Sequence, residues 1–153
     1  MLSRNRHPFG MLAHETGATP WGIDARPVRV EVDVRAGVPQ TQIVGLPDAA
    51  VRESRERVRA AIANCGFKLP QMVVTLRLAP ADLPNAGTHL DLPIALGLLA
   101  AHGHLPAEAL EAVIACGELG LDGEVRSIRA CLAIAELARR RGAKELLVPA
   151  VNG

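Results

Sequence analysis

The sequence predicts a mixed α/β fold, and three of its stretches carry that prediction. Apolar and polar side chains alternate from Val28 to Val34, apolar residues recur at helical spacing between residues 51 and 65, and residues 92–101 form an unbroken apolar run. A period of two is typical of a strand with one buried face, whereas a period near 3.6 is typical of an amphipathic helix. Both patterns occur in turn along the chain, so we expect strands and helices to be interleaved.

Length and composition predict one globular domain with an aliphatic core. The chain has 153 residues, too few for two ordinary domains, and is 49% hydrophobic and 22% charged. Its aromatic residues are Phe9, Trp21 and Phe67. So few rings cannot build the stacking platforms that bind single-stranded nucleic acid. The net charge of +1 gives no overall attraction to nucleic acid or membranes.

Cysteine use and hydropathy predict a cytoplasmic protein. The three cysteines, Cys65, Cys116 and Cys131, have no CxxC spacing, which suits free thiols in a reducing compartment. No apolar run reaches the length that crosses a bilayer, and no signal peptide is recognisable. We therefore expect no membrane partner.

The first half of the chain is expected to run from a leader through a hairpin into a helix. Residues 1–20 lack apolar periodicity and predict a loosely ordered leader, so the domain is expected to span residues 21–153. The turn at residues 36–40 predicts that strand 28–34 pairs with a returning strand at 41–45. A helix then follows with Asp48 as its N-cap and ends at Gly66. The residues predicted to form its buried face are Val51, Ser54, Val58, Ala61, Ile62 and Cys65.

The apolar helix at 92–101 is expected to be the central element. A strand at 72–78 leads into the loop 79–90, after which Asp91 suits an N-cap and Pro93 suits the first turn. A helix that is apolar on every side must be enclosed. Loops that feed a helix N-terminus commonly supply sites for anions and nucleophiles, so loop 79–91 is the first candidate for chemistry.

The remaining third predicts short elements. A short helix is expected at 106–112, a strand at 113–119 and a turn at 121–123 that leads to a short strand at 124–126. A third amphipathic helix is expected at 128–141, ended by Gly142, and a last strand at 145–148.

Several of these stretches resemble one family. The sequence IVGLPDAAVRESRERVRAAI at 43–62, LAPAD at 78–82 and LDLPIAL at 90–96 resemble the N-terminal domain of the ComM/YifB family of magnesium-chelatase-like AAA+ ATPases. The segments CGELGLDGEVRSI at 116–128 and LLVP at 146–149 also resemble Lon proteases and RadA. The resemblance implies an α+β Lon-protease-like domain of the ribosomal protein S5 domain 2 type, with a mixed sheet packed with helices.

The resemblance also implies a motor and its partners. Family members carry an AAA+ motor that uses ATP and magnesium, assembles as a hexamer and acts on DNA in branch migration during natural transformation. In this chain no Gly-Lys dipeptide occurs, so a Walker A loop is absent from residues 1–153. The partners implied are therefore the motor domain, other subunits and, through the full assembly, DNA.

The Lon-like catalytic pair is not expected to survive. A Ser–Lys peptidase needs a hydroxyl and an amine within hydrogen-bond reach. The resemblance places the serine position at about His89 and the lysine position at about Leu132. Neither side chain can perform that chemistry, so we expect no catalytic and no cofactor-binding residue in this chain.

Two other groups of residues are candidate sites. His102, His104 and Cys116 lack a fourth zinc ligand at a recognised spacing, so no metal site is expected. Asp82, His89 and Asp91 could form an acid–base group, but capping and turn hydrogen bonds explain them more simply.

Arginines supply the remaining candidates. The helix at 48–65 carries arginines interleaved with acids, and the helix at 128–141 ends in three consecutive arginines. The candidate phosphate or subunit contacts are Arg52, Arg55, Arg59, Arg139, Arg140 and Arg141.

The sequence thus favours a non-catalytic accessory and assembly domain of a ComM-like ATPase. Two alternatives stay open: a small hydrolase that uses loop 79–91, and an autonomous nucleic-acid-binding module.

Overall fold

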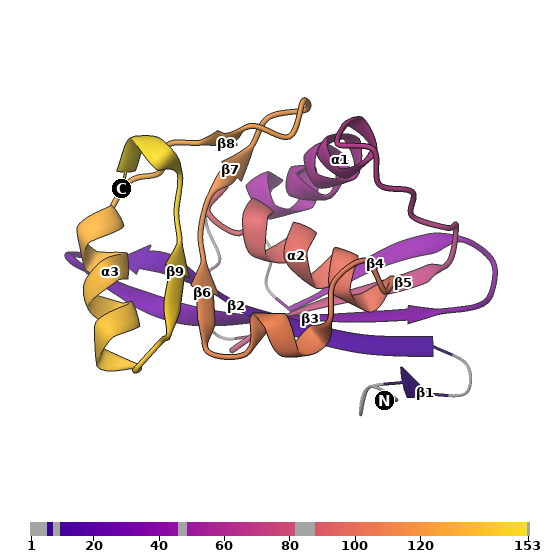
Figure 1. Ribbon diagram of the computed structural model, residues 1–153, viewed down its shortest axis with the longest axis horizontal. Helices are drawn as coiled ribbons and strands as arrows, with labels where there is room; N and C mark the ends of the chain where they lie inside the picture. Colours follow the sequence, from indigo (N-terminus) through magenta and orange to yellow (C-terminus); the bar gives the residue numbers. More distant parts are fainter. Residues whose placement is uncertain (1–5, 8–9, 46–48, 82–87, 153) are drawn as a thin grey trace.

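The computed structural model describes residues 6–7, 10–45, 49–81 and 88–152 as a mixed sheet packed with three helices (Figure 1). The strand order is β4-β5-β3-β2-β6-β9, and β1 pairs with β2 beside this path. A small second sheet joins β7 to β8. The predicted α/β (α+β) class is confirmed, and the arrangement is consistent with a Lon-like domain.

The strands are β1 Arg6–His7, β2 Gly10–Trp21, β3 Asp24–Arg35, β4 Gln40–Val44, β5 Val73–Ala79, β6 Val113–Ala115, β7 Glu118–Leu119, β8 Val125–Arg126 and β9 Glu145–Leu147. The helices are α1 Ala49–Asn64, α2 Asp91–Ala101 and α3 Cys131–Arg140, with short 3-10 helices at Ala107–Leu110 and Ala150–Asn152.

The expected helix at 106–112 is therefore a 3-10 helix. The expected strand at 113–119 is divided into β6 and β7. The third helix begins at Cys131 rather than at residue 128.

The long β2–β3 hairpin forms the centre of the sheet. Its antiparallel register extends from Gly10 opposite Arg35 to Trp21 opposite Asp24. The expectation of a loosely ordered leader at residues 1–20 is therefore wrong for residues 10–20, and the ordered domain does not begin at residue 21. Residues 13, 15, 17 and 19 of β2 are buried even though their side chains are small or polar, so the strand lacks the apolar alternation by which strands are recognised.

Strand β4 does not return beside β3 as expected. It pairs in parallel with β5, and β5 pairs antiparallel with β3, so β5 lies between the two strands that were predicted to form a hairpin. Helix α1 connects β4 to β5, as parallel neighbours require a crossover. The turn at residues 36–40 predicted β3 as the neighbour of β4, which is wrong because the actual partner, β5, comes about thirty residues later in the chain.

Helices α1 and α2 cover one face of the sheet, over a core in which Val30, Val32, Leu76 and Leu78 are at most 1% exposed (Figure 1). The predicted face of α1 is confirmed at Val51, Ser54, Val58, Ala61 and Ile62. Cys65 is exposed, which corrects its place on that face. The expected N-cap Asp48 lies outside the described residues.

Helix α3 packs against a second, smaller core. A methyl group added at Gly17 of β2 would meet Leu90 and Pro93 beside α2, whereas the next residue, Ala18, clusters with Ile134 and Leu137 of α3. Successive side chains of a strand point to opposite faces. The helices α2 and α3 therefore lie on opposite sides of β2.

Helix α2 is less enclosed than the sequence suggested. Eight of its residues are buried, but Leu92, Leu96 and Leu99 are only partly buried and follow one another at spacings of four and three. One stripe of the helix therefore reaches toward the surface. Among the described residues, no helix is both long and apolar enough to span a bilayer.

Candidate functional site

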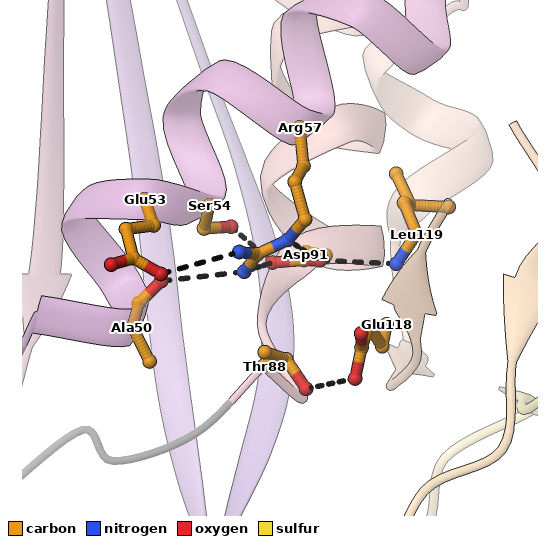
Figure 2. Close-up of polar contacts among 8 residues, drawn as sticks. All are labelled: Ala50, Glu53, Ser54, Arg57, Thr88, Asp91, Glu118 and Leu119. Atoms are coloured by element: carbon orange, nitrogen blue, oxygen red, sulfur yellow. Dashed lines mark hydrogen bonds and ion pairs between the residues drawn. The ribbon is translucent and has the colours of Figure 1, made fainter. Parts of the chain in front are cut away.

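The N-terminus of α2 brings two buried polar residues, Ser54 and Asp91, together with Arg57 (Figure 2). Asp91 is the first residue of α2, not its N-cap, and it is 0% exposed. The cap position is held by Leu90, which makes no side-chain capping bond. A buried carboxylate away from any partner would be prohibitively costly, so the partners of Asp91 decide what this site can do.

Two elements, α1 and β7, supply those partners. Arg57 of α1 donates from Nε to Asp91 Oδ2 at 3.0 Å and from Nη2 to Oδ1 at 3.2 Å. Ser54, one turn earlier on α1, donates its hydroxyl to Oδ1. The backbone N–H of Leu119 in β7 donates to Oδ2 at 3.0 Å. Asp91 therefore joins α1, α2 and β7 at one point.

Arg57 points toward Asp91, although the arginines interleaved with acids on this helix would be expected to face solvent. Its side chain is 21% exposed, and it also donates from Nη2 to the carbonyl oxygen of Ala50 at 3.3 Å. Arg57 also forms an ion pair with Glu53 at 3.9 Å, but Glu53 is 74% exposed and the pair contributes little to stability. The hydrogen bonds to Asp91 raise the pKa of Arg57, so the guanidinium stays charged throughout the physiological range.

The positive end of α2 is already occupied by the protein's own carbonyl groups. The N–H of Asp91 donates to Thr88 O at 3.1 Å, the N–H of Leu92 donates to Gly117 O at 3.0 Å, and Pro93 has no N–H. Gly117 in turn donates to His89 O at 3.0 Å. The first-turn donors that would bind an anion or an oxyanion are therefore engaged.

Residues 82–87 lie outside the described part of loop 79–91, and with them Asp82. The described end of that loop makes two contacts. The hydroxyl of Thr88 donates to Glu118 Oε2 at 2.7 Å, and His89 Nε2 lies 3.1 Å from the carbonyl oxygen of Arg129 (Figure 2 shows the first). His89 and Asp91 thus have separate partners, and the acid–base group weighed for Asp82, His89 and Asp91 is not assembled from the residues described.

The contact of His89 with Arg129 brings together the two segments that would carry a Lon-like pair. The serine position at His89 and the segment that leads into α3 are neighbours, although they are 40 residues apart. The lysine position, Leu132, is 85% exposed. The structure therefore brings together the two segments that the resemblance would pair, while the two side chains are an imidazole and a solvent-facing isobutyl group.

The histidines and cysteine weighed as zinc ligands bind three different backbone carbonyls. His102 Nδ1 lies 2.8 Å from Leu98 O, His104 Nε2 lies 2.7 Å from Lys68 O, and Cys116 Sγ lies 3.9 Å from Ala18 O. Burial raises the pKa of Cys116 to about 12, so its thiol stays protonated and is a poor ligand. Within the described ranges no three His, Cys, Asp or Glu side chains are grouped to hold a metal.

The candidate arginines fall into two separate groups. On α1, Arg52 and Arg59 are exposed, while Arg55 donates to Thr41 O at 3.3 Å. Those three remain predicted contacts.

On α3, Arg139 pairs with Glu136 at 2.6 Å, so one of the three consecutive arginines already has an acidic partner. Arg140 lines a shallow hollow with Asp24 and Leu137, and Arg141 is the C-cap. Arg140 and Arg141 remain predicted contacts, together with Arg139.

The sequence did not predict that Ser54 and Arg57 donate hydrogen bonds to Asp91. One signal was available: Asp91 opens a helix whose other residues are apolar, and a carboxylate in such a place requires a cation or several donors. With fifteen arginines in the chain, spacing could not show which one it would be.

Comparison with known proteins shows the family to which the chain belongs. Residues 30–152 match the family model described as subunit ChlI of Mg-chelatase, and the chain belongs to that family. It is 45% identical over 131 residues to a protein of Mycobacterium tuberculosis, which covers 86% of this chain and 26% of the relative.

Two further relatives carry the names expected from the sequence motifs. YifB of Salmonella typhimurium is 44% identical over 131 residues, and the competence protein ComM of Haemophilus influenzae is 40% identical over 131 residues. Each alignment covers 86% of this chain and 26% of the relative. The resemblance to the ComM/YifB family is confirmed, and the chain spans about a quarter of the length of these relatives.

Proposed function

We propose that residues 1–153 act as a non-catalytic accessory and assembly domain of a ComM-like, magnesium-chelatase-related AAA+ ATPase. The observation that supports this role is the engagement, within the domain, of both carboxylate oxygens of Asp91. Its two carboxylate oxygens receive four donors from Ser54, Arg57 and Leu119. A carboxylate held in this way is suited to fixing the angle between two helices and is poorly suited to exchanging protons with a substrate.

The Lon-like positions support the same view. A nucleophile and a general base would have to meet between His89 and the start of α3. His89 has its Nε2 against a carbonyl oxygen, and Leu132 has no titratable group. The domain would then retain the Lon-like fold as a scaffold without its chemistry.

The rest of the proposal concerns a longer protein. The relatives are about four times as long as the matched segment, and one of them is a competence protein. We propose that a motor following this domain binds ATP and magnesium, assembles as a hexamer and moves DNA branches. This domain would then contact the motor or a neighbouring subunit, in the cytoplasm.

Two assays test the proposal. The isolated chain should neither hydrolyse ATP nor cleave casein or peptides. A longer protein that carries the motor should lose hexamer assembly or branch-migration rate when residues 1–153 are removed. Unaltered assembly and rate after the deletion would reject the accessory role. Turnover by the isolated chain that survives repurification and disappears in His89→Ala would favour the hydrolase instead.

A further inference from the structure

A cavity of about 160 Å³ lies between α1, α2 and the β4–β5 end of the sheet, away from the Asp91 cluster. The apolar residues that line it are Leu69, Met72, Val74, Leu76 and Leu98. A dry apolar cavity of about 150 Å³ is large enough to admit a benzene molecule. The space therefore fits one six-membered ring or an aliphatic group of similar size.

Two cations stand on the α1 side of this cavity. Arg55 and Arg59 are one helical turn apart and both line it. Arg55 is partly used, by Thr41 O at 3.3 Å and by the exposed Glu56 at 3.2 Å. The side chain of Arg59 makes no hydrogen bond or ion pair with any residue that the structure describes. Its guanidinium, with five donors, is thus available for an anion beside an apolar wall.

His102 lines the cavity on the α2 side. His102 Nδ1 lies 2.8 Å from Leu98 O, so this nitrogen carries the proton and donates it to the carbonyl. Burial lowers the pKa of His102, which keeps the ring neutral near pH 7. Its other nitrogen, Nε2, is then an acceptor, and it is buried without a hydrogen-bond partner among the described residues. A ligand that donates a hydrogen bond to a buried acceptor of this kind removes the free-energy cost of leaving it unsatisfied.

We propose that this cavity is a binding site for a small organic anion, with a ring-sized apolar body, one hydrogen-bond donor and one carboxylate. The body would lie against Leu98 and Met72, the donor would reach His102 Nε2, and the carboxylate would pair with Arg59 and Arg55. An apolar pocket with a few convergent polar groups is the usual form of a small-molecule site. The sequence predicts Arg55 and Arg59 as candidate phosphate or subunit contacts, whereas this site would take a different class of ligand.

Three probes separate the parts of this site. 4-Hydroxybenzoate has the ring, the donor and the carboxylate. Its methyl ester lacks the charge, and 4-methoxybenzoate lacks the donor. Titrations of the 153-residue chain, followed by the NMR signals of the Met72 and Leu98 methyl groups, should show the tightest binding for 4-hydroxybenzoate. Loss of the charge should raise Kd by about tenfold or more, as expected for a charge-assisted hydrogen bond.

Matched variants on one helix test the role of the cation. Arg59→Gln should weaken 4-hydroxybenzoate toward the level of the ester, since only Arg55 then remains, and should leave the affinity for the ester unchanged. Arg52→Gln removes an equally exposed arginine that does not line the cavity, and it should bind like the unaltered chain. Thermal melts of both variants establish that they are folded.

Three results would overturn the proposal. One is equal affinity for the acid and its ester, which would mean that no anion is recognised. Another is equal weakening by Arg52→Gln and Arg59→Gln, which would indicate diffuse surface charge. The third is the absence of methyl shifts at probe concentrations near the solubility limit.

Discussion

Arg57 and Asp91 are 34 residues apart in the chain and meet through two hydrogen bonds, from Nε at 3.0 Å and from Nη2 at 3.2 Å. The arginine side chain is 21% exposed and the aspartate is 0% exposed. This geometry joins α1 to α2 on one face of the sheet. It also makes the aspartate dependent on a residue that the sequence pattern assigns to the surface.

Arg57→Met should lower the free energy of unfolding by about 3 kcal/mol, because it leaves a buried carboxylate without its cation. Urea unfolding followed by circular dichroism measures the loss. Arg52→Met is the matched control, since Arg52 is exposed on the same helix, and surface changes of this kind usually stay within about 0.5 kcal/mol. Equal losses in the two variants would mean that the pair with Asp91 contributes nothing specific.

Glu15 should make the protein less stable as the pH rises. Its side chain is 1% exposed on β2, Oε2 has no partner among the described residues, and burial raises its pKa to about 7 from an ordinary value of 4.5. The folded state therefore binds more protons than the unfolded state between these values. Its stabilising contribution is complete below about pH 4.5 and is lost as the pH rises through 7.

Glu15→Gln should remove this dependence. Each pKa unit corresponds to about 1.4 kcal/mol, so the variant should gain up to roughly 3 kcal/mol on the unaltered chain between pH 5 and pH 8. Urea midpoints at the two pH values measure the change. Glu108→Gln, at an exposed position, should show no such gain. Parallel pH profiles for Glu15→Gln and the unaltered chain would contradict the prediction.

Gly97 lets α2 approach β3 closely. A Cβ at this position would lie 2.8 Å from Cγ2 of Val32, a residue that is 0% exposed and has a stiff side chain. Alanine favours a helix by about 1 kcal/mol over glycine, but overpacking a core costs about 1–3 kcal/mol. Gly97→Ala should therefore be neutral to destabilising, and its effect should become favourable in a Val32→Ala background.

A double-mutant cycle from urea unfolding measures this coupling. The methyl added at residue 97 would fill part of the space that Val32→Ala opens. Additive losses in the double variant would show that the two residues do not compete for the same volume.

The isolated domain should bind DNA weakly. Arg139 is already paired with Glu136, so the last turn of α3 offers at most Arg140 and Arg141 as free cations. A few phosphate contacts give weak, steeply salt-dependent affinity, and non-specific binders lie near 10⁻⁴–10⁻⁶ M at about physiological salt. Fluorescence anisotropy with duplex, single-stranded and four-way-junction DNA across a salt series measures it. Submicromolar binding at about 150 mM salt that weakens in Arg140→Glu would favour the nucleic-acid-binding alternative instead.

The regular part of the fold could be predicted because it depends on periodicity within short stretches. The alternation at 28–34, the helical face at 51–62 and the apolar helix at 92–101 each became an element of the expected type. Strand β2 was missed because its buried face includes Gly17, Thr19 and Glu15, which do not form an apolar pattern. The neighbours of β4 were misassigned because strand pairing depends on the whole sheet rather than on the nearest turn.

The sequence by itself determined the α/β class, the family to which the chain belongs and the absence of a Walker A loop from these 153 residues. Tertiary structure decided which arginine lies against Asp91, that Glu15 is enclosed, and that Arg59 and His102 line one cavity. The physical reason is distance along the chain. Periodicity records how a residue relates to its near neighbours, whereas the partner of a buried charge comes from another element and is fixed only when the helices pack on the sheet.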